Sequence, residues 1–179
     1  MNSDAVIQLG NPLLRMICEP ISENLFGSED LNKLESLLFK VLKDENGLGL
    51  AAPQIGISKR AIVFGMEAYR NRPAIPLTLL FNPSFEPLSE LVEEAYEGCL
   101  SVGQLRAKVP RYKSIAYRGF DAEGQLIERE VSDLHARVLQ HELDHLDGIV
   151  FLDKVKDHNS IVFHEELLRS GAISAPRDD

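Results

Sequence analysis

The chain has little of several features that would place it in other protein classes. Its two cysteines show no pairing pattern in 179 residues, which fits a reducing cytoplasm. Positive charge is also scarce, because 19 Lys and Arg stand against 28 Asp and Glu, and the net charge of -9 disfavours unspecific binding to nucleic acid or an anionic membrane. No apolar run approaches the roughly 20 residues of a membrane span, and no charged-then-apolar leader opens the sequence. We therefore expect a cytoplasmic protein with no membrane contact and no specific nucleic-acid partner.

The length predicts one domain over residues 1–179, large enough to bury about 70% of its unfolded surface without a structural metal. Ser28 is placed to cap a helix that starts with two acidic residues, shows leucines at helical spacing and ends before residues 46–47 (NG). A second helix is expected at about 133–146, capped by Ser132 and ended by Gly148. A third is expected at about 160–169.

Asn159 is placed to cap that third helix and Gly171 to end it, with a loose tail at 172–179. Between the first two helices the pattern is rich in β-strand. Short strands are expected at 61–64 and 77–81, separated by a loop at 71–76, and a hairpin at 113–120 and 125–131 around the turn 121–124. The expected fold class is α+β, with short antiparallel sheets packed around the helix at 133–146.

The most informative pattern lies on that helix. His141 and His145 are four residues apart with Glu142 between them, so one helix face can hold a metal ion beside a carboxylate base. On the stripe of Leu134 and Val138, the two histidines would be buried polar rings that need partners, and a metal satisfies both. The alternative for Glu142 is an exposed helix glutamate. The pattern predicts a metal-dependent hydrolase in which Glu142 acts as general base and later as general acid.

The third metal ligand must come from elsewhere in the chain. In the longer form of this motif a glycine and a third histidine follow; Gly148 fits, but Phe151 occupies the position of the third ligand. The best candidate is Cys99, beside Gly98, while Cys18 is expected to be a buried hydrophobe. A small core hydrophobe is the alternative for Cys99 as well. A Cys-His-His set suits ferrous iron, zinc, cobalt or nickel and does not choose among them.

Two other readings use different ligands. A metallopeptidase could take Glu165, 20 residues after His145, as its third ligand, but Cys99 and Gln54 would then have no role. A structural metal site in a binding module would need a fourth protein ligand, for which only His158 and His164 remain besides His135. Nothing in the sequence places these histidines near the motif. A phosphate-binding turn at 47–56 lacks the Gly-Lys-Ser/Thr ending.

Three segments together resemble the motifs of bacterial peptide deformylases, in order and spacing. They are residues 47–54 (GLGLAAPQ), 97–101 (EGCLS) and 140–146 (QHELDHL), and the likeness extends from 10–15 (GNPLLR) to 151–153 (FLD). The resemblance implies a hydrolase of protein biosynthesis that removes the N-formyl group from the initiator methionine of nascent chains and releases formate. It also implies one divalent metal ion, with Fe2+ as the first expectation and Zn2+, Ni2+ or Co2+ as substitutes.

The resemblance also assigns roles to residues. Cys99, His141 and His145 would be the metal ligands and Glu142 the proton shuttle. The side-chain amide of Gln54 and the backbone N–H of Leu100 would stabilise the oxyanion of the tetrahedral intermediate. Gly49 would offer main-chain groups to the substrate, where a side chain would obstruct. Leu48, Leu134 and Val138 would shape the methionine pocket, with ordinary core packing as the alternative for all three.

The chain departs from the family at residues 102–104 (VGQ), where many members have a hydrophobic residue, Pro and Gly, and this segment borders the expected substrate cleft. His135 and Arg137 stand where relatives can be apolar, and charge alone suggests that Arg137 pairs with Glu97. A transient contact with the ribosome is compatible with the resemblance, although the end of the chain at 175–179 (APRDD) is not basic.

Overall fold

The structure is a computed structural model that describes residues 6–69 and 72–173; the remaining residues, including most of the expected tail at 172–179 and the start of the expected loop at 71–76, lie outside the described part. The α-helices of the described part are α1 (Glu29–Asp44), α2 (Asp133–Leu146) and α3 (His164–Arg169). Its strands are β1 (Gly49–Ala51), β2 (Ala61–Met66), β3 (Ile75–Pro87), β4 (Val92–Glu97), β5 (Leu105–Tyr112), β6 (Ser114–Phe120), β7 (Leu126–Ser132) and β8 (Val162–Phe163). Short 3-10 helices connect them: η1 (Pro12–Arg15), η2 (Glu23–Leu25), η3 (Ala52–Ile55), η4 (Leu100–Val102), η5 (Phe151–Lys154) and η6 (His158–Ser160).

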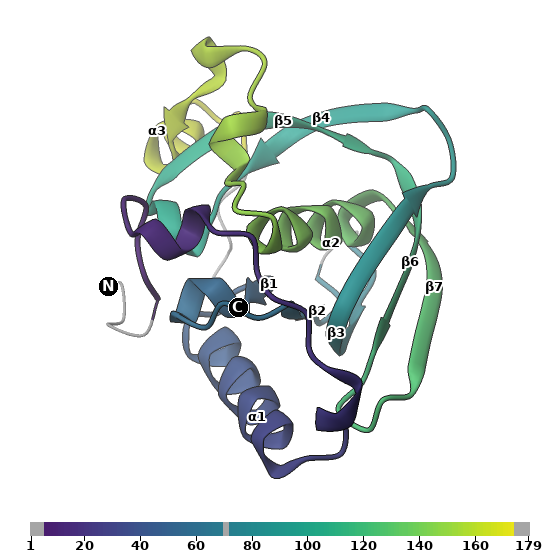
Figure 1. Cartoon of the computed structure of the whole chain (residues 1–179). Helices are drawn as coiled ribbons and strands as arrows, with labels where there is room; N and C mark the ends of the chain where they lie inside the picture. The colour runs from purple at the N-terminus through teal and green to yellow at the C-terminus, as the bar shows by residue number, and fades with distance from the viewer. Residues whose placement is uncertain (1–5, 70–71, 174–179) are drawn as a thin grey trace.

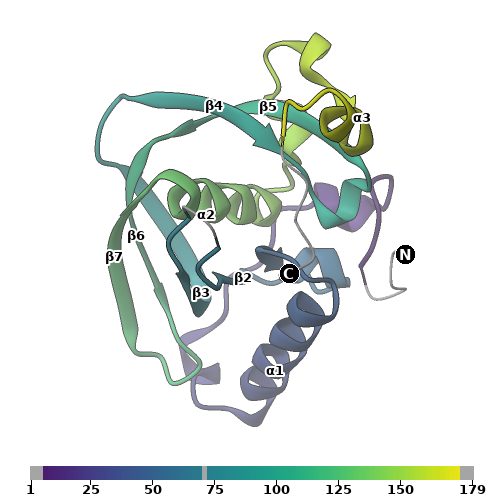
Figure 2. The ribbon, with the colours of Figure 1, turned by 180° about the vertical axis from the view of Figure 1, so that it is seen from behind.

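Two antiparallel sheets enclose α2. The five-stranded sheet has the order β1-β2-β3-β6-β7, and the three-stranded sheet has the order β4-β5-β8. Figure 1 shows α2 between them, with β4 and β5 above the helix and α1 at the far side of the larger sheet. From behind, β4 and β5 arch over α2 and lead toward α3 (Figure 2). The α+β class expected from the sequence, with antiparallel sheets around a central helix, is confirmed.

Apolar packing holds this arrangement. One cluster joins α1 to the larger sheet through Leu38, Leu50 and Val63, all fully buried. A second cluster packs α2 against the opposite face through Leu139 and Leu146. A third, smaller cluster joins β5 to the segment after α2, and Cys99, Ala107, Val109, Phe151 and Val155 form it. The helix therefore has apolar support on one side and the short sheet on the other, which leaves its remaining face free for polar groups.

Several expected elements are confirmed, including the first helix with its Ser28 cap, which accepts from the Leu31 N–H, and the β6–β7 hairpin. Ser132 stands at the N-cap of α2, but its hydroxyl donates to the Asp133 carboxylate instead of accepting from a helix N–H. The expected loop at 71–76 is shorter, because β3 begins at Ile75. None of the described helices has the length and apolarity needed to span a bilayer.

The prediction of the third helix, at about 160–169, is wrong for its first residues. Asn159 lies in η6 and the chain then forms β8, so α3 begins at His164 and ends before Gly171. The reason is tertiary: Val162 and Phe163 pair with β5, and that ladder supplies hydrogen bonds that a helix would have made internally. Strands β4 and β5 were not expected, because β4 is rich in glutamate and β5 contains Pro110, which argues against a strand.

Gly148, after the end of α2, is expected to be intolerant of a side chain because of its positive φ and because of a close contact. Gly171 shares only the positive φ, so comparing the two positions separates these effects. Both have left-handed φ angles, of 72° and 71°, but a Cβ at Gly148 would lie 2.7 Å from the Arg15 carbonyl oxygen, whereas Gly171 has open space. In both Gly→Ala variants, backbone strain should lower the free energy of unfolding by about 1 kcal/mol. In Gly148→Ala, the contact with the Arg15 carbonyl should lower it by about 1 to 3 kcal/mol more. Denaturant unfolding measures both, and equal losses would contradict the contact.

Candidate active site

The structure brings the three predicted metal ligands together. Cys99 follows the end of β4, while His141 and His145 lie one turn apart on α2, and the donor atoms of all three lie within 4.8 Å of one another. Cys99 Sγ is 3.3 Å from His145 Nε2. This is the one group of its kind found in the described ranges 6–69 and 72–173. The thiol and both imidazoles are buried, so the group is a formed site and not a chance cluster on the surface.

The residues of the alternative readings lie outside this group. Glu165 is on α3, where it pairs with Arg169 at 3.5 Å and its side chain is 71% exposed. His158 lies in η6 and His164 starts α3, and neither joins the ligand group. A glutamate-ligated peptidase site and a closed four-ligand site are therefore both unsupported by the described structure.

The donor set fits a divalent metal ion. A thiol and two imidazoles are ligands for zinc and for transition metals such as iron, cobalt and nickel, and three protein ligands leave a coordination position open for chemistry. Beside them, Glu142 Oε2 is buried and has no hydrogen-bond partner among the described residues. A buried carboxylate oxygen without a partner is costly unless a cation or water satisfies it. Cys99, His141 and His145 are the residues that would hold such an ion.

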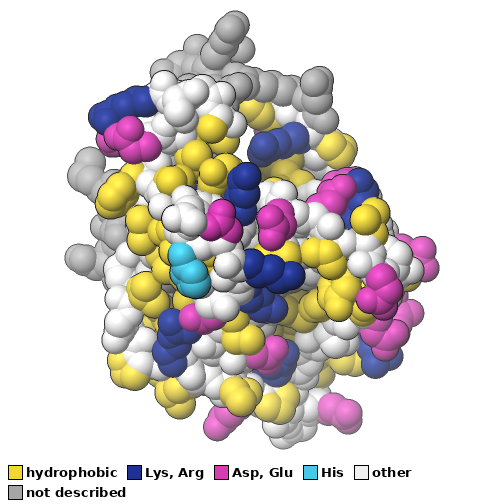
Figure 3. All heavy atoms as spheres, turned by 90° about the horizontal axis from the view of Figure 1, so that it is seen from above, with side chains coloured by type: hydrophobic (Ala, Val, Ile, Leu, Met, Phe, Trp, Pro, Cys, Tyr) yellow, Lys and Arg dark blue, Asp and Glu magenta, His cyan; other side chains and the backbone are white. Residues whose placement is uncertain are grey.

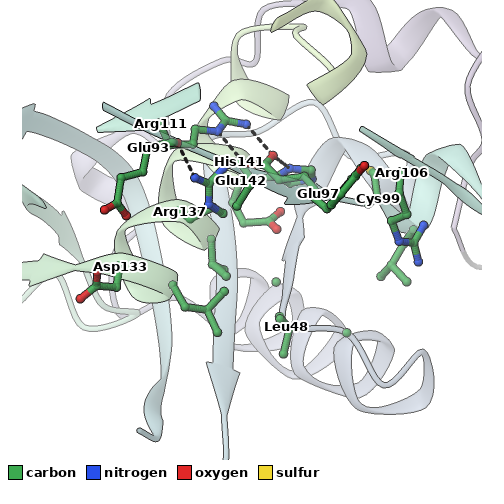
Figure 4. A pocket seen from close by; sticks show the side chains of 18 of the residues that line it. Leu48, Glu93, Glu97, Cys99, Arg106, Arg111, Asp133, Arg137, His141 and Glu142 are labelled. Carbon is green, nitrogen blue, oxygen red and sulfur yellow. Dashed lines mark hydrogen bonds and ion pairs between the residues drawn. The ribbon is translucent and has the colours of Figure 1, made fainter. Parts of the chain in front are cut away.

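Glu97 fixes the orientation of His141. Its Oε2 lies 2.9 Å from His141 Nδ1, and Arg111 forms a two-bond pair with the same carboxylate, Nε to Oε1 and Nη2 to Oε2, each at 2.9 Å (Figure 4). Burial opposes the ionised carboxylate, but the hydrogen bonds from Arg111 and His141 outweigh it and hold the pKa of Glu97 far below its usual range. A charged acceptor at Nδ1 requires a proton there, so the Nε2 lone pair is left to face the ligand group.

Arg111 extends this network away from the metal ligands. Its Nη1 donates to Asp144 on α2, and Asp144 in turn pairs with Lys154 at 2.9 Å. The side chain of Arg111 is 3% exposed, and pairing with Glu97 and Asp144 raises its pKa further against the effect of burial. Strand β5, helix α2 and η5 are thus joined by charged hydrogen bonds beneath the site. Arg111 and Asp144 were not predicted from the sequence, and the signal that could have pointed to them is a charged residue at a buried position of a strand or helix.

The expected pairing of Arg137 with Glu97 is confirmed, at 2.8 Å between Nη1 and Oε1. Arg137 also donates to the carbonyl oxygens of Val109 on β5 and Glu93 on β4, at 2.8 and 2.7 Å. The side chain therefore ties α2 to both strands of the short sheet at the level of the ligand His141. Cys18, whose role the sequence left open, is buried at 2% exposure in the cluster under α2, as expected of a small hydrophobe.

Glu142 lies against the backbone of β1. Burial raises its pKa to about 7. A Cβ at Gly49 would lie 2.3 Å from Glu142 Oε1, so only glycine leaves room for the carboxylate. A glycine at position 49 is therefore also explained by packing inside the protein, because β1 approaches the carboxylate of Glu142 on α2 closely.

Gln54 and Leu100 lie beside the ligands. The Oε1 atom of Gln54 accepts from the Ala51 N–H at 2.8 Å, which turns Nε2 toward Cys99 Sγ at 3.5 Å and Ser101 Oγ at 3.2 Å. Only the Oε1 end of the Gln54 amide therefore bonds the backbone of its own loop. Leu100 directly follows Cys99 and begins η4, so its amide group is next to a predicted metal ligand. Two N–H groups from different segments are thus held near the ligand group.

A cavity of about 840 Å³ opens over the ligand group, and the predicted substrate residues Leu48, Gly49, Leu134 and Val138 line it. Leu48 is 37% exposed, so the alternative of ordinary core packing is wrong for this residue, whereas Val138 is buried. Charged side chains line the cavity too, among them Glu93, Arg106 and Arg137. Figure 3 shows acidic and basic side chains close together across the middle of the face seen from above. The cavity is consequently less apolar than the three predicted pocket residues alone suggested.

A buried Cys-His-His group beside a buried carboxylate and the side-chain amide donor of Gln54 is the arrangement of a metal-dependent hydrolase. The family model described as polypeptide deformylase matches residues 3–160. Peptide deformylase 1 of Bordetella pertussis is 42% identical over 166 residues, covering 91% of this chain and 93% of that protein. Peptide deformylase 2 of Pseudomonas syringae pv. tomato is 44% identical over 161 residues, covering 88% and 90%.

Solved structures agree with this. A class I type b peptide deformylase from Acinetobacter baumannii with Met-Ala-Ser bound superposes with a TM-score of 0.80 at 31% identity, covering 87% of this chain and 100% of that one. The peptide deformylase from Thermotoga maritima gives 0.76 at 30% identity, covering 85% and 97%. The chain belongs to the polypeptide deformylase family, hydrolases that remove the N-formyl group from nascent polypeptides.

The buried ion network predicts a large effect of removing its central cation. Arg111→Met leaves Glu97 and Asp144 buried without their shared partner, so the free energy of unfolding should fall by about 3 to 5 kcal/mol. Arg169→Met is the matched control, since Arg169 is an arginine of α3 with two acidic partners but a side chain that is 68% exposed, and it should leave stability almost unchanged. Denaturant unfolding of both variants measures the difference; a small loss for Arg111→Met would refute the central role of this cation.

Proposed function

We propose that this chain hydrolyses the N-formyl group of initiator methionine on nascent polypeptides, releasing formate, with one divalent metal ion held by Cys99, His141 and His145. The observation that carries the proposal is the buried ligand group with Glu142 beside it and an open cavity above. A divalent ion there would act as a Lewis acid toward the formyl carbonyl and favour ionisation of the attacking water. The chain acts as a single catalytic domain over residues 1–179.

Glu142 moves the proton in this proposal. Its carboxylate takes a proton from the attacking water and later gives it to the departing amine of the methionine. The pKa of about 7 that burial gives it supports both halves of this task near neutral pH. The absence of a Cβ at Gly49 lets the carboxylate lie against β1 at the side of the cavity.

Gln54 and Leu100 stabilise the oxyanion that develops on the formyl carbon. The Gln54 Nε2 group lies 3.5 Å from Cys99 Sγ, and the Leu100 N–H belongs to the residue that follows Cys99. Such preorganised donors can each stabilise the transition state by about 3 kcal/mol. The bond from the Ala51 N–H to Gln54 Oε1 supports this role, because it sets which end of the amide faces the site.

The substrate is a linear peptide whose first side chain enters a pocket formed by Leu48, Leu134 and Val138, while Gly49 offers main-chain groups to its backbone. The cavity lining supports this arrangement, and so does the structural neighbour that holds Met-Ala-Ser, the peptide that would remain after formate leaves. Because nascent chains are made in the cytoplasm, the proposed reaction takes place there. A transient contact of the enzyme with the ribosome is compatible with this substrate.

The proposed metal is Fe2+, with Zn2+, Ni2+ or Co2+ as functional substitutes. A thiolate donates more electron density than a carboxylate and suits these softer divalent ions. The open fourth position is required by each of them for hydrolysis.

Glu142→Gln tests the proton shuttle. The amide keeps the shape of the side chain but cannot accept the proton, so we expect metal content near one ion per chain and formate release lowered by at least about 100-fold. Formate release from a formyl-Met peptide and metal analysis of the same sample provide the measurement. Activity within a few-fold of the parent protein, a change of about 1 kcal/mol in barrier, would rule out this assignment.

Three peptides test the substrate assignment. Formyl-Met-Ala should be hydrolysed about 10 to 200 times more efficiently than formyl-Val-Ala, because a β-branched side chain fits this pocket less well than the unbranched, polarizable methionine. Acetyl-Met-Ala should be a still poorer substrate, because its extra methyl occupies the space between the ligand group and the two N–H donors. Comparison of kcat/KM values decides: equal values for formyl and acetyl peptides would contradict the deformylase assignment, and internal cleavage of an unblocked peptide would favour a peptidase.

A further inference from the structure

The two proposed oxyanion donors lie on separate segments that are not strands of a common sheet. Gln54 lies in η3 and Leu100 begins η4, and the side chains of Gln54 and Ser101 supply a link of 3.2 Å between the two segments. In the three-residue η4 the Val102 N–H donates to the Cys99 carbonyl, which shares a peptide plane with the Leu100 N–H, and so short a helix gives that amide little further support of its own.

A third segment, residues 6–9, binds both of them. The Ile7 N–H donates to the Gln54 carbonyl at 2.8 Å, and the Leu9 N–H donates to the Ser101 carbonyl at 2.7 Å. Between these two bonds, the Gln8 side chain donates from Nε2 to the Leu100 carbonyl at 3.2 Å and to the Val6 carbonyl at 3.1 Å. We name residues 6–9 the N-terminal strap, because they bridge η3 and η4.

The strap is itself anchored at both ends. Val6 is buried in the cluster formed by α1 and the larger sheet. After the strap, Asn11 caps η1 by accepting from the Leu13 N–H, and the Arg15 carbonyl lies against Gly148 at the end of α2. In Figure 1 the purple N-terminal segment passes beside the end of α2. An anchored strap with bonds to both segments limits their relative movement more than either bond would alone.

We propose that Gln8 is a positioning residue for the oxyanion-binding N–H groups, an inference that rests on the proposed roles of Gln54 and Leu100. Its amide holds the carbonyl of Leu100 while the strap backbone holds those of Gln54 and Ser101. The Leu100–Ser101 and Ser101–Val102 peptide planes are thereby held relative to Gln54 before substrate arrives. The adjoining Cys99–Leu100 plane, which carries the Leu100 N–H, is held by the Val102 N–H at the Cys99 carbonyl, so the strap acts on that N–H through the next peptide plane. Such preorganisation lowers the barrier because donors that already point at the developing charge need not reorganise during the reaction.

Gln8→Met tests this, since methionine has a similar length but no donor for the Leu100 carbonyl. We expect kcat for formyl-Met-Ala to fall about fivefold to thirtyfold, less than the loss of a whole donor, while KM stays within about twofold. Metal content should remain at one ion per chain. Gln125→Met is the matched control at an exposed position of the β6–β7 hairpin, and it should leave kcat unchanged.

Gln54→Ala in the same assay separates this inference from the proposed function. A large fall of kcat for Gln54→Ala with no fall for Gln8→Met would overturn the positioning role alone. No fall for either variant would overturn the oxyanion assignment and this inference together. A loss for Gln8→Met that follows only a lower melting temperature or lower metal content would also overturn the inference, because it would show a merely structural role.

Discussion

The site depends on one buried carboxylate, that of Glu97. It lies two residues before the proposed ligand Cys99, accepts from Nδ1 of the proposed ligand His141, and is held by Arg111 and Arg137. The end of β4 and the two residues after it therefore supply one proposed ligand and fix the orientation of a second, which comes from α2. If Glu97 moved, both donor atoms would move relative to each other, so the geometry of the centre follows from this contact.

Such a network is poorly explained by stability alone. Burying Glu97, Arg111 and Asp144 requires removing three charges from water, and well-packed apolar residues of similar volume often give equal or greater stability. The orientation of His141 supplies the reason to keep them. Mutating the residue that hydrogen-bonds the second nitrogen of a ligating histidine typically lowers metal affinity or activity about 10- to 100-fold. The N-terminal strap has a comparable relation to the proposed oxyanion donors, since it bonds to both η3 and η4.

Local patterns were sufficient to predict part of this structure. Helical spacing with the Ser28 cap gave α1, and the motif around Glu142 gave α2 with its ligands, because their signals lie within a few residues. Strands β4 and β5 were missed since Arg111 takes the place of an apolar residue in the buried alternation and Pro110 argues against a strand. The contact between Arg111 and Asp144 and the strap contacts of Gln8 join residues far apart in the chain, which no local pattern records. The first half of the third helix was wrong for a similar reason, the pairing of β8 with β5.

The central claim is that the Cys99, His141 and His145 group holds the metal on which hydrolysis depends. The direct measurement is formate release from formyl-Met-Ala by protein purified without oxygen, before chelation, after complete removal of metal, and after return of Fe2+ or Zn2+. The account predicts one ion per chain at the start, loss of formate release on chelation, and recovery in proportion to the metal restored, with Cys99→Ala failing to recover. Undiminished formate release from protein shown to contain no metal would contradict it.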